Sequence, residues 1–491
     1  MSASPDRVRF APSPTGYLHI GGLRTALYNW LQARKTGGAF LLRIEDTDRS
    51  RLVDDAMANL VRTLTLCGVL PDEGVMLDAQ GALTQVGEVG PYIQSERRER
   101  HLQYAYELIE KDHAYYCFCT EEDLSKMRET QTLNKQPVMY DRRCRAIPKE
   151  QAENRAAVGD ACVIRLKMPL EGSCVFHDEI RGRIEVPWAQ VDDQVLIKTD
   201  GYPTYHLAAT CDDHDMRITK VIRGEEWISS TPKHLYLAQV MGWTPPTYAH
   251  VPLLLNPDRS KLSKRQGDVA VEDYLAKGYL PEALINFVAL LGWNPTSDRE
   301  IFTKEELAPL FDLTKVNPSG AVMNVEKLEW LNGHYLKTMS EERYLALAEP
   351  VLRTVMDDQE RLVRAARLFR DRVTRVQLLP ELVMPWLTRP IATAELVLWK
   401  TQTVADARER LTAVREWLAS CSEEFFASVS SIEEPTKAWI AERGWGNGEV
   451  LWPLRTALSG AKQSPSPFEL LYLVGKEEGL ARIDEALAHL A

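Results

Sequence analysis

The stretch at residues 11–22 contains groups that could bind and polarise a phosphate. It carries His19 and ends with the glycine pair Gly21 and Gly22. Glycine lets an anion approach the backbone closely, and the N-terminus of a helix favours negative charge. His19 can donate a hydrogen bond to a phosphoryl oxygen. A tight turn with one surface histidine is the structural alternative, because short glycine motifs are common.

A second stretch, Lys-Leu-Ser-Lys-Arg at residues 261–265, follows the apolar run at residues 252–255. Isolated basic pentapeptides are usually solvated loops. Positive groups such as Lys261 and Lys264 can also stabilise the negative charge that builds on phosphoryl oxygens during transfer from a nucleotide. The two stretches together suggest chemistry at a nucleotide phosphate, with His19, Lys261 and Lys264 as catalytic groups. This chemistry requires no nucleophilic serine or cysteine.

The first stretch lies between a predicted strand and a predicted helix. Residues 8–11 are typical of a short strand, which prolines break into a loop. In the next segment one helical face is apolar, formed by Leu23, Ala26, Leu27, Trp30 and Leu31. The glycines at 37 and 38 end this helix, and residues 40–44 form another strand that closes in an acidic run at 45–48. This order of elements predicts the start of a parallel α/β sheet.

The remaining chain divides into a mixed segment and a helical half. Residues 96–192 combine cysteines with short β-like runs such as residues 162–166, which predicts an inserted α+β module. Residues 195–198 and 221–222 resume strands, and from about residue 257 the pattern is mostly helical. One face of the last helix carries Leu480, Ile483, Leu487 and Leu490. The predicted fold class is α/β, with a Rossmann-like parallel sheet and an inserted α+β module, followed by an all-helical C-terminal half.

Composition is typical of a globular protein in a reducing compartment. The chain has 491 residues, of which 45% are hydrophobic and 26% charged, and this length predicts about three domains. The net charge of −11 argues mildly against a generally basic surface, but it is compatible with a local basic face. The sequence shows no signal-peptide pattern and no apolar run as long as a membrane span. We therefore expect a cytoplasmic protein that does not bind a membrane.

Together, His-Ile-Gly-Gly at residues 19–22 and Lys-Leu-Ser-Lys-Arg at residues 261–265 resemble the two signature motifs of class I aminoacyl-tRNA synthetases. Gly22 stands where that family often has histidine, and Arg265 replaces the common serine. The resemblance implies that a carboxylate attacks the α-phosphate of ATP and expels pyrophosphate, with Mg²⁺ neutralising the leaving group. A small-substrate nucleotidylyltransferase can share the first motif, but the long helical half argues against it. A catalytically silent tRNA-binding paralogue is disfavoured because the three catalytic groups are intact.

Four further stretches, at residues 8–13, 43–48, 200–206 and 221–227, look like bacterial glutamyl-tRNA synthetase. This resemblance implies activation of L-glutamate with ATP and its transfer to the tRNA for glutamate, and it leaves open whether the tRNA for glutamine is also an acceptor. It assigns to glutamate binding Arg9, Ala11, Ser13, Glu45, Tyr205 and Arg223. It assigns to ATP binding His19, Gly21, Gly22, Glu226, Trp227, Leu254 and Lys264, although Trp227 could equally be a core residue.

The same resemblance implies a division of the chain into five segments. A Rossmann-like catalytic domain occupies residues 1–95 and 193–256, and a module that binds the tRNA acceptor is inserted at residues 96–192. A loop of the KMSKS type and a helical stem-contact domain follow at residues 257–335. Residues 336–491 form a helical anticodon-binding domain, which glutamyl-queuosine synthetases lack and which is typically a β-barrel in glutaminyl enzymes. We expect a monomer.

The implied pocket residues match the charges of glutamate. Arg9 and Arg223 can bind the two carboxylates bidentately, and Glu45 can bind the α-ammonium group. The sequence leaves open which arginine binds which carboxylate. Glutaminyl-tRNA synthetases typically have glutamate in place of Ser13 and lack the arginine at position 223, so both positions favour glutamate. Ala209 departs from family members that have asparagine near the substrate carboxylate.

Three cysteines in the inserted module could bind zinc. Cys117 and Cys119 are followed by Cys144, and tetrahedral zinc requires a fourth ligand. Some glutamyl-tRNA synthetases resemble this spacing and add a histidine at the position of Ala146. Tyr140 could replace it, as in the related glutamyl-queuosine synthetases. A vestigial site with three free thiols is the alternative.

An arginine-rich segment at residues 361–376 could contact tRNA. If the whole segment is helical, one face is apolar, and a different face carries Arg361, Arg364, Arg372 and Arg375. A solvated helix face is the alternative interpretation. The functional interpretation is a surface that contacts the phosphates of the tRNA anticodon arm.

Overall fold

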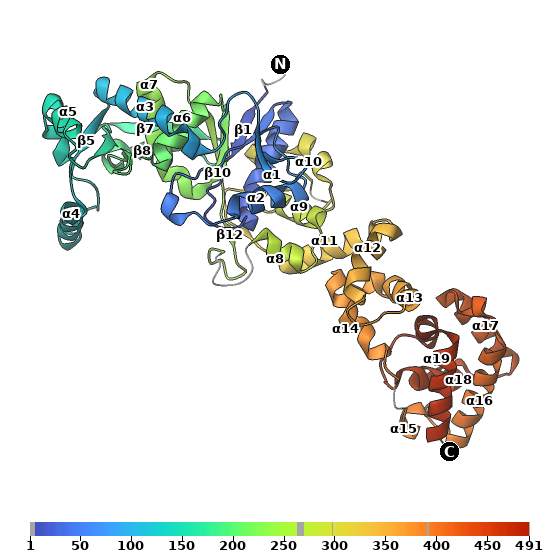
Figure 1. Cartoon of the computed structure of the whole chain (residues 1–491). Helices are drawn as coiled ribbons and strands as arrows, with labels where there is room; N and C mark the ends of the chain where they lie inside the picture. The colour runs from blue at the N-terminus through green and yellow to red at the C-terminus, as the bar shows by residue number, and fades with distance from the viewer. Residues whose placement is uncertain (1–4, 263–269, 297, 390–391, 491) are drawn as a thin grey trace. The chain divides into compact units, whose positions relative to one another are not determined.

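The computed structural model describes residues 5–262, 270–296, 298–389 and 392–490, and it divides into two compact units (Figure 1). Unit 1 is Met1–Leu331 and unit 2 is Asn332–Ala491, so the boundary falls within helix α11 (Val325–Thr338). No helix within the described ranges is long and apolar enough to cross a membrane. The α/β class predicted for the first part and the helical class predicted for the second are both confirmed.

Two sheets form the centre of unit 1. The first has the strand order β1 (Arg7–Phe10), β2 (Ala39–Leu42), β3 (Glu73–Leu77) and β4 (Leu83–Val86), with β1, β2 and β3 parallel. The second has the order β10 (Lys220–Gly224), β11 (Thr247–Val251), β7 (Ser173–Asp178) and β8 (Gly182–Pro187), with β10, β11 and β7 parallel. The backbone N–H of Thr219 donates to the Arg7 carbonyl, which brings β10 beside β1.

Helix α1 (Ile20–Thr36) lies between β1 and β2 in the sequence and forms the crossover that a parallel strand pair requires. It buries Leu23, Leu27 and Leu31 in the core of unit 1. Gly37 ends the helix in the left-handed conformation, with a φ of 67°. Gly38 has no room for a side chain, because a Cβ there would lie 1.8 Å from the Asp6 carbonyl oxygen. The glycine pair therefore ends the helix as predicted and starts β2.

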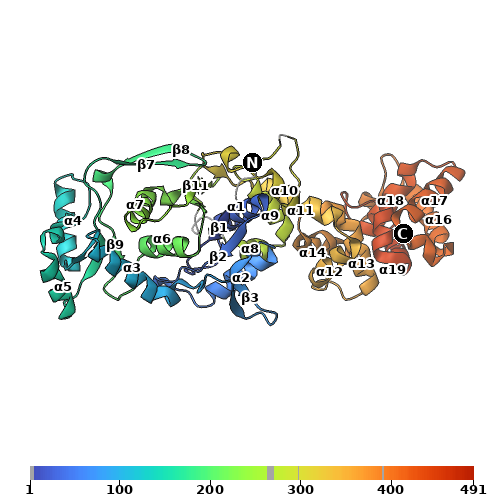
Figure 2. The same ribbon diagram turned by 90° about the horizontal axis from the view of Figure 1, so that it is seen from above.

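The remaining helices of unit 1 lie around these sheets, except α4 and α5, which lie beside β5 of the inserted module (Figures 1 and 2). They are α2 (Ala56–Leu66), α3 (Arg98–Glu110), α4 (Glu121–Leu133), α5 (Lys149–Ala157), α6 (Tyr205–Asp215), α7 (Thr231–Met241), α8 (Val271–Ala276), α9 (Pro281–Ala289) and α10 (Lys304–Leu310). A short parallel pair joins β12 (Leu254–Leu255) to β13 (Ala321–Val322). Figure 2 shows the β7–β8 hairpin in green, reaching toward β11.

The strand expected at residues 195–198 forms, but it does not resume the central sheet. It is β9 (Val195–Ile197), and it pairs antiparallel with β6 (Val163–Leu166), which in turn pairs with β5 (Ala114–Cys117). Leu196 and Ile197 pack with Ile164 and Leu166 in a separate small core. Because a strand joins the neighbour that buries its apolar side chains, β9 belongs to the sheet of the inserted module.

Unit 2 is helical throughout its described residues. Its helices are α12 (Glu341–Leu352), α13 (Gln359–Phe369), α14 (Leu379–Val383), α15 (Ala394–Val397), α16 (Val404–Ser420), α17 (Val429–Glu442), α18 (Asn447–Ser459) and α19 (Pro467–His489). Leu480, Ile483 and Leu487 of α19 pack into the core formed with α16, α17 and α18, as the apolar periodicity predicts. Gly475, with a φ of 78°, kinks α19.

The prediction of a continuous helix over residues 361–376 is wrong. Helix α13 ends at Phe369, and a short 3-10 turn and an extended residue follow. Arg370 donates to the carbonyls of Leu336 and Met339, and the β-branched Val373 and Thr374 have low helix propensity. The apolar residues still face the core, but the arginines do not share one helical face.

Candidate active site

A cavity of about 680 Å³ opens in unit 1 at the carboxyl ends of β1, β2 and β10. Every predicted pocket residue that the structure describes lines this cavity. The set comprises Arg9, Ala11, Ser13, His19, Gly21, Gly22, Glu45, Tyr205, Arg223, Glu226, Trp227, Leu254 and Lys261. Lys264 lies outside the described residues. The described residues of both motifs, although far apart in the sequence, thus line the same cavity.

His19 occupies the N-cap of α1, and its backbone is extended. The His19 Nδ1 atom accepts a hydrogen bond of 3.0 Å from the Gly21 N–H, so a neutral ring carries its proton on Nε2. This Nε2–H is the donor that a phosphate-binding role requires. A Cβ at Gly22 would lie 3.0 Å from Leu18 Cδ1 and 3.6 Å from the Phe10 ring, so histidine would not fit there without a shift.

Of the second motif, the structure describes residues 261 and 262, and both line the same cavity. Leu254 is buried on β12, and Lys261 is exposed and forms an isolated bridge with Leu255. Both residues line the cavity together with Trp227, whose ring centroid is 4.3 Å from that of Tyr205. The partly buried Trp227 therefore lines the cavity wall, so the interpretation as a core residue alone does not describe it.

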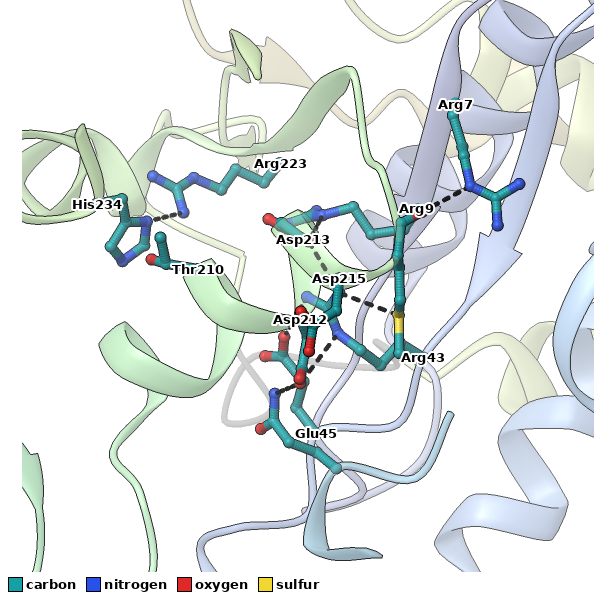
Figure 3. A network of polar contacts seen from close by, with 12 residues as sticks. Arg7, Arg9, Arg43, Glu45, Thr210, Asp212, Asp213, Asp215, Arg223 and His234 are labelled. Carbon is teal, nitrogen blue, oxygen red and sulfur yellow. Dashed lines mark hydrogen bonds and ion pairs between the residues drawn. The ribbon is translucent and has the colours of Figure 1, made fainter. Parts of the chain in front are cut away.

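Arg9 is already paired with a carboxylate that the sequence did not point to (Figure 3). Asp213 of α6 accepts from Arg9 Nε at 3.0 Å and from Arg9 Nη2 at 3.2 Å. Arg43 donates to the same carboxylate at 2.8 Å and to Glu45 at 3.1 Å. All four side chains are buried. Two cations and two carboxylates therefore compensate one another, and a third carboxylate, that of Asp212, lies 4.0 Å from Arg43 Nε and also pairs with Arg97.

The pKa values of the two acids reflect this cluster. Burial raises the pKa of Glu45 above its ordinary value, against the opposing effect of Arg43 and Arg9. For Asp213, burial is opposed by the charges of Arg9 and Arg43, which hold the pKa below its ordinary value. Asp213 is therefore ionised at neutral pH and compensates the two arginines.

Arg223 has a different environment, although it is only 5% exposed on β10. Its Nε–H donates to His250 Nε2 at 3.1 Å, and its Nη2 donates to Thr231 Oγ1 at 2.9 Å and to the Trp227 carbonyl at 3.2 Å. Its Nη1 lies 3.0 Å from the Tyr205 hydroxyl and 3.2 Å from His234 Nδ1. None of the described carboxylates pairs with it. Arg223 is thus a buried cation held only by neutral acceptors.

The histidines around Arg223 stay neutral. Burial, with the charge of Arg223 second, lowers the pKa of His234 well below its ordinary value. Burial likewise lowers the pKa of His206, to about 3, and His206 Nδ1 lies 3.1 Å from His234 Nε2. For His250, burial and Arg223 outweigh the hydrogen bond to Asp178, and the pKa is again lowered. No second cation therefore arises beside Arg223 at neutral pH.

Sequence reasoning missed Arg43, Asp213, His234 and His250. A signal existed for the first two. Arg43 is part of the stretch at 43–48 that was already singled out, and Asp213 lies eight residues after Tyr205, about two turns along the same side of α6. The two histidines carry no local signal, because only the pairing of β10 with β11 and the packing of α7 bring them to Arg223.

The three cysteines of the inserted module form one cluster with Tyr140. Their sulfurs all lie within 4.8 Å of one another, and Cys119 Sγ is 3.6 Å from Cys144 Sγ. The Tyr140 hydroxyl lies 3.3 Å from Cys117 Sγ and 3.5 Å from Cys119 Sγ. The spacing that suggested a metal site therefore corresponds to a real three-dimensional group.

The four arginines expected to contact tRNA have unequal surroundings in unit 2. Arg364 pairs with Glu360 and donates to the Tyr472 carbonyl, and Arg372 pairs with Glu469. Arg361 has two guanidinium nitrogens that are buried without a hydrogen-bond partner in the structure. Arg375 is half-buried. Arg364 and Arg372 are thus already used within the unit.

Comparison with known proteins identifies the family. Residues 6–330 match the model of class I tRNA synthetases (E and Q), catalytic domain, and residues 343–487 match the model of an anticodon binding domain. The fold and the cavity therefore define a class I tRNA synthetase, and the chain belongs to the E and Q family of that class. The predicted class and the predicted anticodon-binding half are confirmed.

The chain is also similar to proteins that it matches over nearly their full length. A glutamate–tRNA ligase of Chloroherpeton thalassium is 44% identical, with 100% of this chain and 99% of the relative covered. One of Finegoldia magna is 43% identical, with 98% and 99% covered. The crystal structure of a glutamate tRNA ligase from Elizabethkingia meningosepticum in complex with its amino acid superposes with a TM-score of 0.88 at 36% identity, covering 99% of this chain and 100% of that one.

Proposed function

We propose that the protein is a glutamate–tRNA ligase. It activates L-glutamate with ATP to glutamyl-adenylate and pyrophosphate, and it then transfers the glutamate to the 3′ end of tRNA. The observation that carries this proposal is a single cavity of about 680 Å³ that gathers His19 and Lys261 together with Arg9, Glu45 and Arg223. The relatives that match over the full chain carry the same name.

The charges of the cavity support glutamate as the amino acid. The cluster of Arg9, Arg43, Glu45 and Asp213 is balanced, whereas Arg223 adds one uncompensated positive charge. L-Glutamate carries a net charge of −1 at neutral pH and L-glutamine carries none, so glutamate supplies the negative partner that Arg223 lacks and glutamine does not. A site that leaves a buried polar group unpaired with the wrong substrate can reject that substrate by about 10⁴–10⁵.

The proposed activation needs positioning and positive charge at the phosphates. The Nε2–H of His19 and the ammonium groups of Lys261 and Lys264 would stabilise the charge that develops on the phosphoryl oxygens. Gly21 and Gly22 would admit the nucleotide at the start of α1, with Glu226, Trp227 and Leu254 at the same wall. Mg²⁺ would arrive with ATP and neutralise the leaving pyrophosphate.

We also propose that Cys117, Cys119, Tyr140 and Cys144 bind a structural zinc ion. Tetrahedral zinc with Zn–S bonds of about 2.3 Å separates its ligand atoms by roughly 3.5–3.8 Å. The separations of 3.5 and 3.6 Å lie in that range, and the 3.3 Å between Cys117 Sγ and the Tyr140 hydroxyl is slightly shorter. Metal analysis of purified protein should give about one zinc per chain, and Cys162→Ser should retain it while Cys144→Ser loses it. Less than about 0.2 zinc per chain would contradict the site.

In unit 2, the proposed partner is the anticodon arm of tRNA. Among the predicted contacts we favour Arg361, because none of the described carboxylates of the unit pairs with it and its charge is left uncompensated. We further propose that the inserted module, whose sheet consists of β5, β6 and β9, binds the acceptor end, and that residues 257–335 contact the stem. The monomeric state and the cytoplasmic location stay predictions. Whether the tRNA for glutamine is also an acceptor stays open.

One assay tests the proposal. The protein is incubated with ATP, total tRNA and radiolabelled glutamate or glutamine, and acid-precipitable label is measured. We expect charging with glutamate alone, and a loss of at least about tenfold in kcat/KM for Arg223→Gln, since it removes a charged hydrogen-bonding group. Arg183→Gln, in an exposed pair with Glu185, is the matched control. Charging with glutamine instead, or tRNA binding without charging, would refute the proposal.

A further inference from the structure

We propose that Asp178 and His250 form a positioning pair that fixes the guanidinium plane of Arg223 in the amino-acid pocket. Neither residue lines the cavity, so the pair acts through Arg223 and does not contact the substrate. The inference rests on the proposed function, because it assumes that Arg223 binds a carboxylate of the amino acid.

The three residues form a chain of hydrogen bonds across one sheet. Arg223 of β10 and His250 of β11 are register partners in the parallel ladder, so their side chains leave neighbouring strands side by side. His250 Nδ1 lies 2.6 Å from Asp178 Oδ2, and its Nε2 accepts from Arg223 Nε at 3.1 Å. His250 and Asp178 are fully buried. Water therefore cannot replace either bond.

Asp178 sets the tautomer of His250. An ionised carboxylate only accepts hydrogen bonds, so His250 must carry its proton on Nδ1 and present a lone pair on Nε2. Burial opposes ionisation of Asp178, but the hydrogen bonds from His250, Arg181 and Ile180 hold its pKa below the ordinary value. The lone pair on Nε2 is what the Nε–H of Arg223 needs. With the other tautomer, two donors would face each other in a buried site.

Asp178 links the β7–β8 hairpin to the amino-acid pocket. Asp178 ends β7, and its Oδ1 accepts from the N–H groups of Ile180 and Arg181 in the turn to β8. Its Oδ2 accepts from the His250 N–H at 3.1 Å, in addition to the imidazole. The carboxylate thus ties the hairpin turn to β11 and orients His250 with the same atoms. Both oxygens of the Asp178 carboxylate therefore accept two hydrogen bonds each.

Three substitutions separate positioning from packing. Asp178→Asn keeps the shape and the Oδ1 acceptor for the turn, but it places an NH₂ group at the Oδ2 position. This change forces the proton of His250 to Nε2, and it also removes the acceptor of the His250 backbone N–H. His250→Phe removes the acceptor, whereas His250→Gln can still offer an oxygen to Arg223. Asp160→Asn, in an exposed pair with Arg155, is the matched control for the change from aspartate to asparagine.

The primary measurement is glutamate-dependent ATP–pyrophosphate exchange by the full chain in the presence of tRNA. We expect Asp178→Asn and His250→Phe to raise KM for glutamate by about ten- to a hundredfold, the range of one hydrogen bond to a charged group. KM for ATP should stay within about twofold, and His250→Gln should recover most of the glutamate KM. Equal rises in both KM values, no rise in either, or a His250→Gln variant as impaired as His250→Phe would overturn the inference.

A second measurement does not depend on activity. Nitrogen-15 spectra of histidine-labelled full chain report which imidazole nitrogen is protonated, and the His250 signal is assigned by its loss in His250→Gln. We expect the proton on Nδ1 in the wild type and on Nε2 in Asp178→Asn. A wild-type proton on Nε2 would refute the pair even if charging is normal. If the protein does not charge glutamate, the proposed function fails, but this measurement still decides the tautomer.

Discussion

The shared carboxylate of Asp213 is the part of the site whose removal should have the largest measurable effect on stability. Asp213→Asn keeps the shape of the side chain but removes the charge that compensates Arg9 and Arg43. After the change, Arg43 retains Glu45 at 3.1 Å, but Arg9 has no carboxylate partner among the described residues. The substitution therefore leaves a buried guanidinium uncompensated.

The expected loss of stability follows from burial. The Arg9 and Asp213 side chains are 4% and 8% exposed, and breaking a buried ion pair by removing one partner costs about 3–5 kcal/mol. A unit of residues 1–331 has an unfolding entropy near 0.7 kcal/mol/K, so this loss lowers Tm by roughly 4–7 °C. The folded pKa of Asp213 is depressed, so its contribution is present above the unfolded value of about 3.9 and is lost as the pH falls below it.

Calorimetry of the full chain at pH 7 and at pH 3 measures both effects. The matched control is Asp484→Asn, because Asp484 binds Arg415 through two bonds of 2.8 and 2.9 Å while being 49% exposed. An exposed pair of this kind contributes about 0–1 kcal/mol, so the control should hardly change Tm. A loss for Asp213→Asn no larger than that of the control at pH 7, or a difference that grows at pH 3, would refute the reasoning.

Three further predictions concern pH, catalysis and tRNA. Burial lowers the pKa of His206 from about 6.5 in the unfolded chain to about 3 in the folded protein, so the free energy of unfolding falls by about 1.4 kcal/mol per pH unit as the pH falls from roughly 6 to 4. Urea unfolding of His206→Asn should show a weaker dependence of this free energy on pH, and an unchanged dependence would contradict the burial of this ring. Lys264→Ala should lower the rate of glutamate activation by about 10²–10³ with little change in tRNA affinity, and equal losses in both would contradict its assigned role. Arg361→Ala should weaken tRNA binding in a filter assay and reduce its salt slope by about one, whereas the exposed, paired Arg415→Ala should not; the same loss in both variants would exclude a specific contact.

Local signals in the sequence were sufficient for the elements around the first motif. Helix α1, with His19 as its N-cap and Gly37 as its C-cap, follows from the spacing of apolar residues and from the glycine pair that ends it. The same local logic failed at residues 361–376, where apolar periodicity continues but the helix ends at Phe369. There, the guanidinium of Arg370 donates to the carbonyls of Leu336 and Met339, about 30 residues earlier in the chain. Such contacts have no signature in a short window of sequence.

The sequence by itself determined which chemical groups the site contains, because the two motifs and the two pocket arginines stand in recognisable stretches. Only the tertiary structure decided how those groups are charged and oriented. Arg9 and Arg223 cannot be distinguished by residue type. In the structure, Asp213 neutralises Arg9, while neutral acceptors such as His250 surround Arg223. The reason is physical: the effect of a charge depends on the partners within a few ångströms and on the loss of water, and sheet pairing and helix packing set both.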